Sequence, residues 1–165
     1  MIKDSGARRQ FEDGAVRDIQ EGKGRCDLMP LSEVGRFLNL FKEEPKNYND
    51  ILVQISEYQN TGVAVHLARA IKSFVQLSKW ENEYEMFLDL AKHFEDGCKK
   101  YGKRNWEKGI DTKCFIDSGV RHFLKYMAGH DDEPHDRAFV WNLICCIWTS
   151  KNLPKFESYG KASKK

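Results

Sequence analysis

The stretch EPHDRAFVWNLICCIWTS, Glu133–Ser150, decides the fold. Drawn as a helix, it carries apolar side chains on nearly every side rather than along one stripe, which is typical of a helix buried at the centre of a domain. Asn142 interrupts its apolar middle and lies seven residues after His135, two turns along the same face. The range therefore predicts a central helix with a polar seam.

The segments around this helix repeat apolar residues at intervals of three or four, as helices with one buried face do. The clearest is 83–101, which Gly102 follows as a terminating glycine. No segment of useful length alternates with period two. The sequence therefore predicts an all-α fold, a single-domain helical bundle of about six helices with an irregular N-terminal arm. The expected helices span residues 32–41, 49–58, 63–77, 83–101, 113–128 and 133–150.

The length of 165 residues leaves room for one core. We expect an irregular arm over 1–30, an all-α domain over 31–150 and a basic tail over 151–165. The tail, with five lysines and one glutamate, accounts for the net charge of +2, so the body is not a polycation. Since no groove-reading motif accompanies the charge, we do not expect duplex nucleic acid as a partner.

Membrane and secreted classes are disfavoured by the apolar pattern. The longest apolar run is Leu143–Trp148, far short of the ~18 residues of a membrane span, and the N-terminus lacks the apolar segment of a signal peptide. Five cysteines, two of them adjacent, form neither a disulfide framework nor a pair of CxxC metal motifs. We expect a cytoplasmic protein.

Acids and histidines crowd the turn between the last two expected helices. Three acids and two histidines within 130–135 favour a hard cation, although a solvated turn with acids at a helix N-terminus has the same composition. His122 should lie about two helical turns away, on the order of 10 Å by helix rise. We therefore do not expect His122 and His135 to share one ion, although a two-ion site could span them. Asn142 either holds a helix contact together or faces a ligand pocket.

A polar stripe along 83–101 is the second candidate for chemistry. Paired carboxylates at this spacing suit magnesium-dependent pyrophosphate chemistry, and they are equally common on a solvated helix face. Glu95 lies nearer the apolar stripe and is the sharper candidate. The stripe itself consists of Glu85, Asp89, His93 and Asp96.

Two further segments suit phosphate contacts. KKYGKRNWEKG, Lys99–Gly109, combines cations with an aromatic residue and an asparagine around a glycine break. GKGR, Gly22–Arg25, offers backbone N–H groups and two cations, but it is not a Walker A motif.

Three blocks together resemble the phage-associated dATP/dGTP diphosphohydrolase N-terminal family: EGKGRCDLMP, HFEDGCKKYGKRNWEKGI and DSGVRHFLKYMAGHDDEPHDRAFVWNL. The family pattern is GK-x-R-x-DL-x-P, then KYG-x-x-NW-x-x-G, then RH…G-x-x-x-[DE]…H…A-x-x-N. The resemblance covers about 7–30 and 90–150, so 40–85 looks like an insertion with extra helices. It implies hydrolysis of dATP or dGTP to the monophosphate and pyrophosphate, and kinship with the all-α MazG-type pyrophosphatases.

On the hypothesis of such an enzyme, we expect a cofactor, Mg²⁺ or Mn²⁺, and roles for residues in and around the matched motifs. The implied catalytic residues are Glu95, His122 and His135. The implied metal ligands are Glu95, Asp96, Asp117, Asp131, Glu133 and His135. The implied substrate-binding residues are Lys23, Arg25, Lys100 and Arg121 for the phosphates, and Asn105, Trp106 and Asn142 for the base and sugar.

A rival class is a non-catalytic phage or prophage protein that binds a nucleotide or a host partner through the same seam. MazG-type enzymes hold Mg²⁺ with an ExxE…ExxD pattern, and His135 and Ala138 stand at the aligned positions here, which favours the rival. The charged residues of the matched motifs favour the enzyme. The resemblance further implies a homo-oligomer, located in the host cytoplasm if a phage encodes it.

Overall fold

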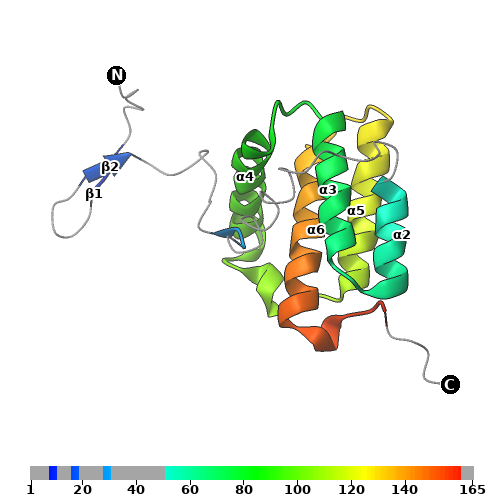
Figure 1. Ribbon diagram of the computed structural model, residues 1–165. Coiled ribbons are helices and arrows are strands. Elements are labelled where there is room, and N and C mark those ends of the chain that lie inside the picture. The colour runs from blue at the N-terminus through cyan, green and yellow to red at the C-terminus, as the bar shows by residue number, and fades with distance from the viewer. Residues whose placement is uncertain (1–7, 11–15, 19–27, 31–50, 161–165) are drawn as a thin grey trace.

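The computed structural model describes residues 8–10, 16–18, 28–30 and 51–160. Within these residues, five α-helices form the body of the molecule, which confirms the all-α prediction (Figure 1). The expected helix over 32–41 lies outside the described residues. The α-helices are α2 (Ile51–Thr61), α3 (Val65–Leu77), α4 (Glu83–Tyr101), α5 (Thr112–Met127) and α6 (His135–Asn152), with short 3₁₀ turns η2 (Asn105–Lys108) and η3 (Pro154–Phe156).

Two strands precede the helices. β1 (Arg8–Gln10) pairs antiparallel with β2 (Val16–Asp18), and Arg9 lies opposite Arg17. The sequence did not indicate this ribbon, because three residues are too few for a period-two pattern to stand out.

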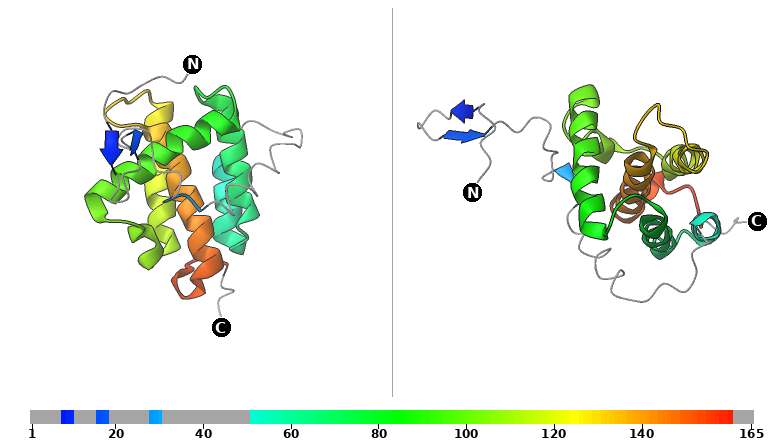
Figure 2. Two further views of the ribbon diagram at one scale, coloured as in Figure 1. Left: turned by 90° about the vertical axis from the view of Figure 1, so that its left-hand side faces the viewer. Right: turned by 90° about the horizontal axis from the view of Figure 1, so that it is seen from above.

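Helix α6 lies at the centre of the bundle, as its all-round apolar pattern predicts. Seen from above, it is surrounded by α3, α4 and α5, and α2 lies beside α3 at the edge (Figure 2). Phe139, Leu143 and Ile144 are fully buried. The Phe139 ring packs edge-to-face on Phe74 of α3, with centroids 4.6 Å apart. A truncation such as Phe139→Ala would cost about 3–5 kcal/mol, so the axis of α6 is firmly held.

Both ends of helix α4 are set by a residue next to the helix, a side-chain cap at the start and a glycine at the end. The Asn82 side chain caps it by accepting hydrogen bonds from the amides of Tyr84 (3.0 Å) and Glu85 (3.1 Å). At the other end Gly102 takes φ = 89°, a conformation that suits glycine and lets the chain leave the helix. These ends fix α4 over the range predicted from the sequence and set the start of the loop that follows.

Helices α5 and α6 approach closely along one line, here called the α5–α6 seam. A Cβ on Gly119 would lie 2.9 Å from Leu143 Cδ1 and 3.3 Å from Asn142 Cβ, so glycine is what permits this contact. The buried face of α5 is narrower than its apolar residues predict, because Leu124 and Met127 are exposed. The seam therefore brings two specific faces together, and the polar residues of α5 and α6 lie along it.

The end of the described chain returns to the bundle after α6. Glu157 accepts hydrogen bonds from Tyr58 Oη at 2.8 Å and from Thr112 Oγ1 at 2.9 Å. It also accepts one from the Tyr159 amide at 2.9 Å, and the Tyr159 ring packs edge-to-face on Tyr58. These contacts, here called the Glu157 network, join the C-terminal end of α6 to α2 and α5.

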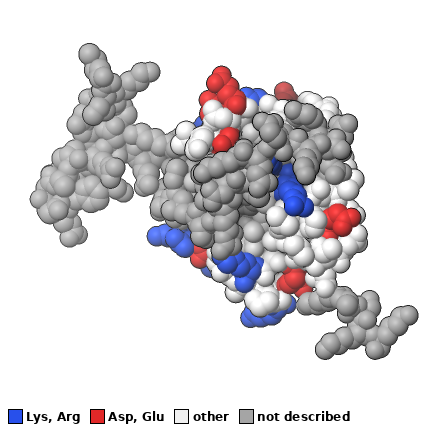
Figure 3. Space-filling model, viewed as in Figure 1, with Lys and Arg blue, Asp and Glu red and all other residues white. Residues whose placement is uncertain are grey.

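The described surface carries both signs of charge. On the face shown in Figure 3, Lys and Arg are interspersed with Asp and Glu. Among the described residues, no helix combines the length and the hydropathy that a membrane span requires.

Candidate functional site

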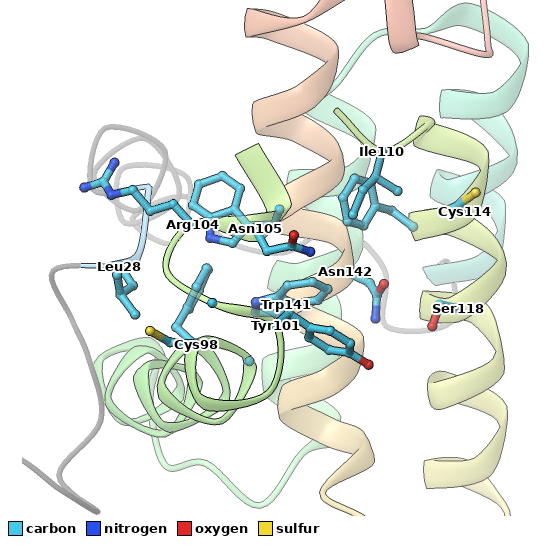
Figure 4. A pocket seen from close by; sticks show the side chains of 15 residues that line it. Leu28, Cys98, Tyr101, Arg104, Asn105, Ile110, Cys114, Ser118, Trp141 and Asn142 are labelled. Carbon is cyan, nitrogen blue, oxygen red and sulfur yellow. The ribbon is translucent and has the colours of Figure 1, made fainter. Parts of the chain in front are cut away.

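A pocket of about 330 Å³ opens between the end of α4, η2, the first half of α5 and the middle of α6 (Figure 4). This volume lies at the small end of the range of ligand sites. The lining is mostly apolar and aromatic, with a few polar side chains that include Asn105, Ser118 and Asn142. An aromatic pocket with a few amides and hydroxyls suits a flat, polar-edged ring such as a nucleobase.

Two tryptophans of the lining are held by other aromatic rings. Phe94 packs against Trp106 with centroids 5.7 Å apart and against Trp141 at 6.1 Å, and Phe115 supports Trp141 from α5 at 6.0 Å. Within the described part of the chain, the buried indole N–H groups of Trp106 and Trp141 find no hydrogen-bond partner. These nitrogens are almost inaccessible to solvent, so ring packing, and not a hydrogen bond to a ligand, holds the two indoles in place.

Asn142 faces this pocket, which supports the second of its two interpretations. Its Nδ2 donates to the carbonyl of Ala138, 2.9 Å away on the same helix, and only 5% of the residue is exposed. One amide donor is thereby used, and the carbonyl oxygen has acceptor capacity for a ligand. In Figure 4, Asn142 and Asn105 border the pocket, whereas the guanidinium of Arg104 points away from the other labelled side chains.

A second group of polar side chains lies where α5 meets the start of α6. His122 Nδ1 lies 3.0 Å from His135 Nδ1, and Glu133 Oε1 lies 3.6 Å from each of these nitrogens. These three residues, here called the His–Glu cluster, are the one group among the described residues whose ligand atoms are placed to hold a metal ion. His135 is 2% exposed, His122 is half-buried and Glu133 is exposed, so the cluster is open on the Glu133 side.

The expectation that His122 lies on the order of 10 Å from His135 is wrong, because their Nδ1 atoms are 3.0 Å apart. That expectation was based on the separation of the two backbone positions along a helix axis. In the structure both imidazoles project into the seam, and their side chains bridge the offset between the two helices. The turn is also held against α5, because the Lys125 ammonium lies 3.0 Å from Asp132 Oδ2 and 3.8 Å from Glu133 Oε1.

Asp132 orients the buried histidine. Its Oδ1 lies 2.8 Å from His135 Nε2, and because a carboxylate only accepts, Nε2 carries the proton and Nδ1 presents a lone pair to the cluster. Hydrogen bonds from His135 and then from Lys125 lower the pKa of Asp132 to about 2. Burial lowers the pKa of His122, although the nearby Glu133 carboxylate opposes this, so His122 is neutral at neutral pH.

The pocket and the His–Glu cluster occupy successive levels of the same seam. Ser118 of the pocket lies one turn before His122 on α5, and Asn142 lies two turns after His135 on α6. By helix rise these steps are about 6 Å and about 10 Å. His93 of α4 lies near both levels, since its ring contacts Trp141 at 5.4 Å and the charges of His122 and Glu133 act on it. Burial, then Arg137, lowers its pKa to about 4.

Several predicted acidic ligands do not join the cluster. Glu95 is 5% exposed and pairs with Lys99 at 3.3 Å. Successive helix residues are 100° apart, so Glu95 lies on a different side of α4 from His93. The remaining predicted ligands are Asp96, which pairs with Arg137 at 3.4 Å, Asp117, which pairs with Arg121, and Asp131, which is exposed in the turn.

The structure places only some of the predicted substrate-binding residues in the pocket. Asn105, Trp106 and Asn142 line the pocket. Arg121 adjoins His122 on exposed α5 surface. The Lys100 ammonium lies 5.0 Å from the ring centre of Tyr101, a pocket residue. Lys23 and Arg25 lie outside the described residues.

Trp141 and Lys125 are among the residues of the site that were not identified from the sequence. From the sequence, Trp141 is indistinguishable from the other core residues of its apolar helix. The only indication that it belongs to a site is its position beside Asn142. From the sequence, Lys125 resembles a solvated surface lysine. It is seven residues before Asp132, close enough to the turn between α5 and α6 for the two side chains to pair.

A comparison with protein-family models matches residues 75–158 to the family described as dATP/dGTP diphosphohydrolase, N-terminal. The match spans α4, η2, α5, α6 and η3, and so includes the His–Glu cluster and nearly all of the pocket. The chain belongs to this family. No curated protein and no solved structure matches the chain.

Proposed function

From membership of the dATP/dGTP diphosphohydrolase N-terminal family, we propose that the chain hydrolyses dATP and dGTP to the deoxynucleoside monophosphate and pyrophosphate. The observation that carries this proposal is the continuity of the α5–α6 seam, which places an aromatic pocket about one to two helical turns from a cluster of two histidines and a carboxylate. A nucleotide has the same two parts, a flat base and a charged phosphate chain.

The base is proposed to lie in the pocket. Trp106 and Trp141 offer a stacking surface, and the amides of Asn105 and Asn142 can meet both donors and acceptors on a purine edge. Because this site supplies polar groups that a hydrocarbon ligand would leave unpaired, it should reject a base whose edge lacks matching atoms.

The phosphate chain is proposed to lie at the His–Glu cluster, together with a divalent cation, Mg²⁺ or Mn²⁺. The donors fit a cation, since two imidazole nitrogens and one carboxylate oxygen converge within 3.6 Å of one another. When bound, such an ion would stabilise charge that develops on the phosphate oxygens. His122, Glu133 and His135 would hold it.

Side chains around the cluster would orient the phosphates and the attacking water. Lys125 is a cation at the open side, and Glu133, with 45% of its side chain exposed, meets incoming water. The Glu133 oxygen that does not face the histidines can accept a proton from that water. His93, neutral because its pKa is lowered to about 4, can accept or donate a hydrogen bond between the two levels.

The test is a product assay on the full chain. Each dNTP is incubated with Mg²⁺ or with Mn²⁺, and monophosphate and pyrophosphate are quantified together. The proposal expects equal amounts of both products from dATP or dGTP. It further expects His135→Asn to abolish them and His130→Asn, an exposed histidine of the same turn, to retain them. Release of single phosphate, or no turnover by a folded protein, would contradict the proposal.

A non-catalytic nucleotide-binding role is the second candidate, and one observation favours it. Lys125 already pairs with Asp132 and approaches Glu133, so the cluster is partly charge-compensated without a metal ion. This candidate expects dATP or dGTP to raise the melting temperature of the protein without any product. The homo-oligomer, the cytoplasmic location and the insertion over 40–85 stay predictions.

A further inference from the structure

We propose that the His–Glu cluster binds a transition-metal dication, of the class Mn²⁺, Fe²⁺, Co²⁺ or Zn²⁺, in preference to Mg²⁺. This inference deepens the proposed function by naming the class of ion at its site. It concerns binding by His122, Glu133 and His135, so it can be tested without a nucleotide.

The three ligand atoms already form the triangle that such an ion requires. Its sides are 3.0 Å between the two Nδ1 atoms and 3.6 Å from each Nδ1 to Glu133 Oε1. A point equidistant from all three atoms lies about 2.0 Å from each, which is the usual metal–ligand distance for imidazole and carboxylate ligands. An ion could therefore bind all three atoms with little movement of the side chains.

Asp132 supplies the outer contact that metal-binding histidines commonly have. It accepts the Nε2 proton of His135 at 2.8 Å, and this fixes the tautomer in which Nδ1 is free to bind a metal ion. In the metal-free protein, one of the two facing Nδ1 atoms must carry a proton, so His122 donates to His135. Metal binding would require only that His122 adopt its other tautomer.

The donor types decide between the classes of ion. Mg²⁺ prefers oxygen ligands and keeps several waters, whereas Mn²⁺, Fe²⁺, Co²⁺ and Zn²⁺ accept imidazole nitrogen. Two of the three donors here are imidazoles, and one of them, His135, is almost fully buried. The arrangement of two histidines and one carboxylate leaves the solvent side open for water or phosphate oxygens.

Lys125 limits the affinity. Its ammonium lies 3.8 Å from Glu133 Oε1 and 3.0 Å from Asp132 Oδ2, so an arriving dication meets a positive charge. Lys125→Met should therefore bind the dication more tightly than the wild type. This direction is opposite to that expected if Lys125 only holds the turn in shape.

The experiment titrates the full chain, without nucleotide, with Co²⁺ followed by visible absorption and with Mn²⁺ followed by loss of the free-ion EPR signal. Mg²⁺ is then added as a competitor. We expect Mn²⁺ and Co²⁺ to bind at least tenfold more tightly than Mg²⁺. His122→Asn and Glu133→Gln should each weaken binding at least tenfold, whereas His130→Asn should leave it unchanged.

Two outcomes separate this inference from the proposed function. Tight Mn²⁺ and Co²⁺ binding that depends on His122 and Glu133, without any dNTP hydrolysis, would support the inference and contradict the enzyme. Turnover that runs equally with Mg²⁺ and survives His122→Asn, with no Co²⁺ spectrum, would support the enzyme and overturn the inference. Circular dichroism of each variant establishes that it is folded, and His122→Asn, at a half-buried position, remains informative if His135→Asn does not fold.

Discussion

The two ends of α6 carry polar networks of different kinds. At the C-terminal end, both oxygens of Glu157 accept from donors of the chain itself, Tyr58 on one oxygen and Thr112 with the Tyr159 amide on the other. At the N-terminal end, two imidazole nitrogens face each other and a carboxylate oxygen stands 3.6 Å from both. The first network is complete, whereas the second has an excess of acceptors.

This difference separates a structural network from a binding site. A polar group whose hydrogen bonds are all made within the chain stabilises the fold and offers nothing to a ligand. A group of converging lone pairs is electrostatically unfavourable until a proton or a cation lies between them. We therefore expect changes at the N-terminal end to alter binding and turnover, and changes at the C-terminal end to alter stability.

The largest effect is expected for His135→Asn. This change removes the buried imidazole from the cluster, so we expect kcat for pyrophosphate release to fall about 100-fold or more. Steady-state kinetics on dATP and dGTP measure it, with His130→Asn as the matched control. Retention of more than a tenth of the wild-type kcat by a folded variant would contradict the assignment of this end of α6 as the reacting end.

The next effect is expected for Asp132→Asn, which removes the carboxylate that orients His135. Such outer contacts are worth about 10–100-fold in metal affinity, so Mn²⁺ binding should weaken by that factor while the fold is kept. Asp131→Asn, at the exposed neighbouring position, is the control. Equal losses for the two variants would mean that only the net charge of the turn matters.

A smaller effect is expected for Asn142→Ala in the pocket. Loss of one hydrogen bond of about 0.5–1.5 kcal/mol corresponds to a rise in KM of about twofold to thirteenfold, with kcat changed less. Initial rates over a range of dGTP concentrations give both constants. A fall in kcat at unchanged KM would place Asn142 at the reacting atoms instead of the base.

The smallest effect is expected for Glu157→Gln, and it concerns stability. Burial raises the pKa of Glu157, but hydrogen bonds from Ser150, the Tyr159 amide, Tyr58 and Thr112 outweigh burial and lower it. Because the folded pKa lies below the unfolded value of 4.5, the carboxylate contributes stability above pH 4.5 that is lost as the pH falls through the folded pKa.

We expect Glu157→Gln to lower the free energy of unfolding by about 1 kcal/mol at pH 7, since the site is partly exposed. Denaturant titrations at several pH values should show this difference shrinking below pH 4.5, with metal binding and turnover unchanged. A loss of turnover in this variant would remove the distinction between the two ends of α6.

Sequence periodicity was sufficient to locate the five α-helices of the described residues. The predicted range 83–101 matches α4, and Gly102 marks its C-terminal end in the sequence, whereas the Asn82 cap at its N-terminal end was found only in the structure. The central place of α6 followed from its lack of a polar face. The pairing of β1 with β2 did not follow, since strands of three residues carry no periodic signal.

The site was less accessible to the same reasoning. Asn142 was identified from its place in an apolar helix and Asn105 and Trp106 from the composition of their loop, the family resemblance matched all three, and all three line the pocket. The meeting of His122 with His135 depends on side-chain conformation across the seam, which helix rise does not report. Glu95 is a case of the opposite kind, in which a predicted site residue lies elsewhere. Its position near the core favoured it as a metal ligand, whereas in the structure it pairs with Lys99.

The central claim is that the pocket and the His–Glu cluster form one nucleotide site. The most direct measurement is a crystal structure of the full chain with Mn²⁺ and a dGTP analogue that carries a methylene group between the α- and β-phosphorus atoms. The account predicts guanine against Trp106 and Trp141, and an anomalous Mn²⁺ peak between His122, Glu133 and His135 beside the phosphates. A nucleotide bound elsewhere, with the pocket and the cluster both unchanged, would contradict it.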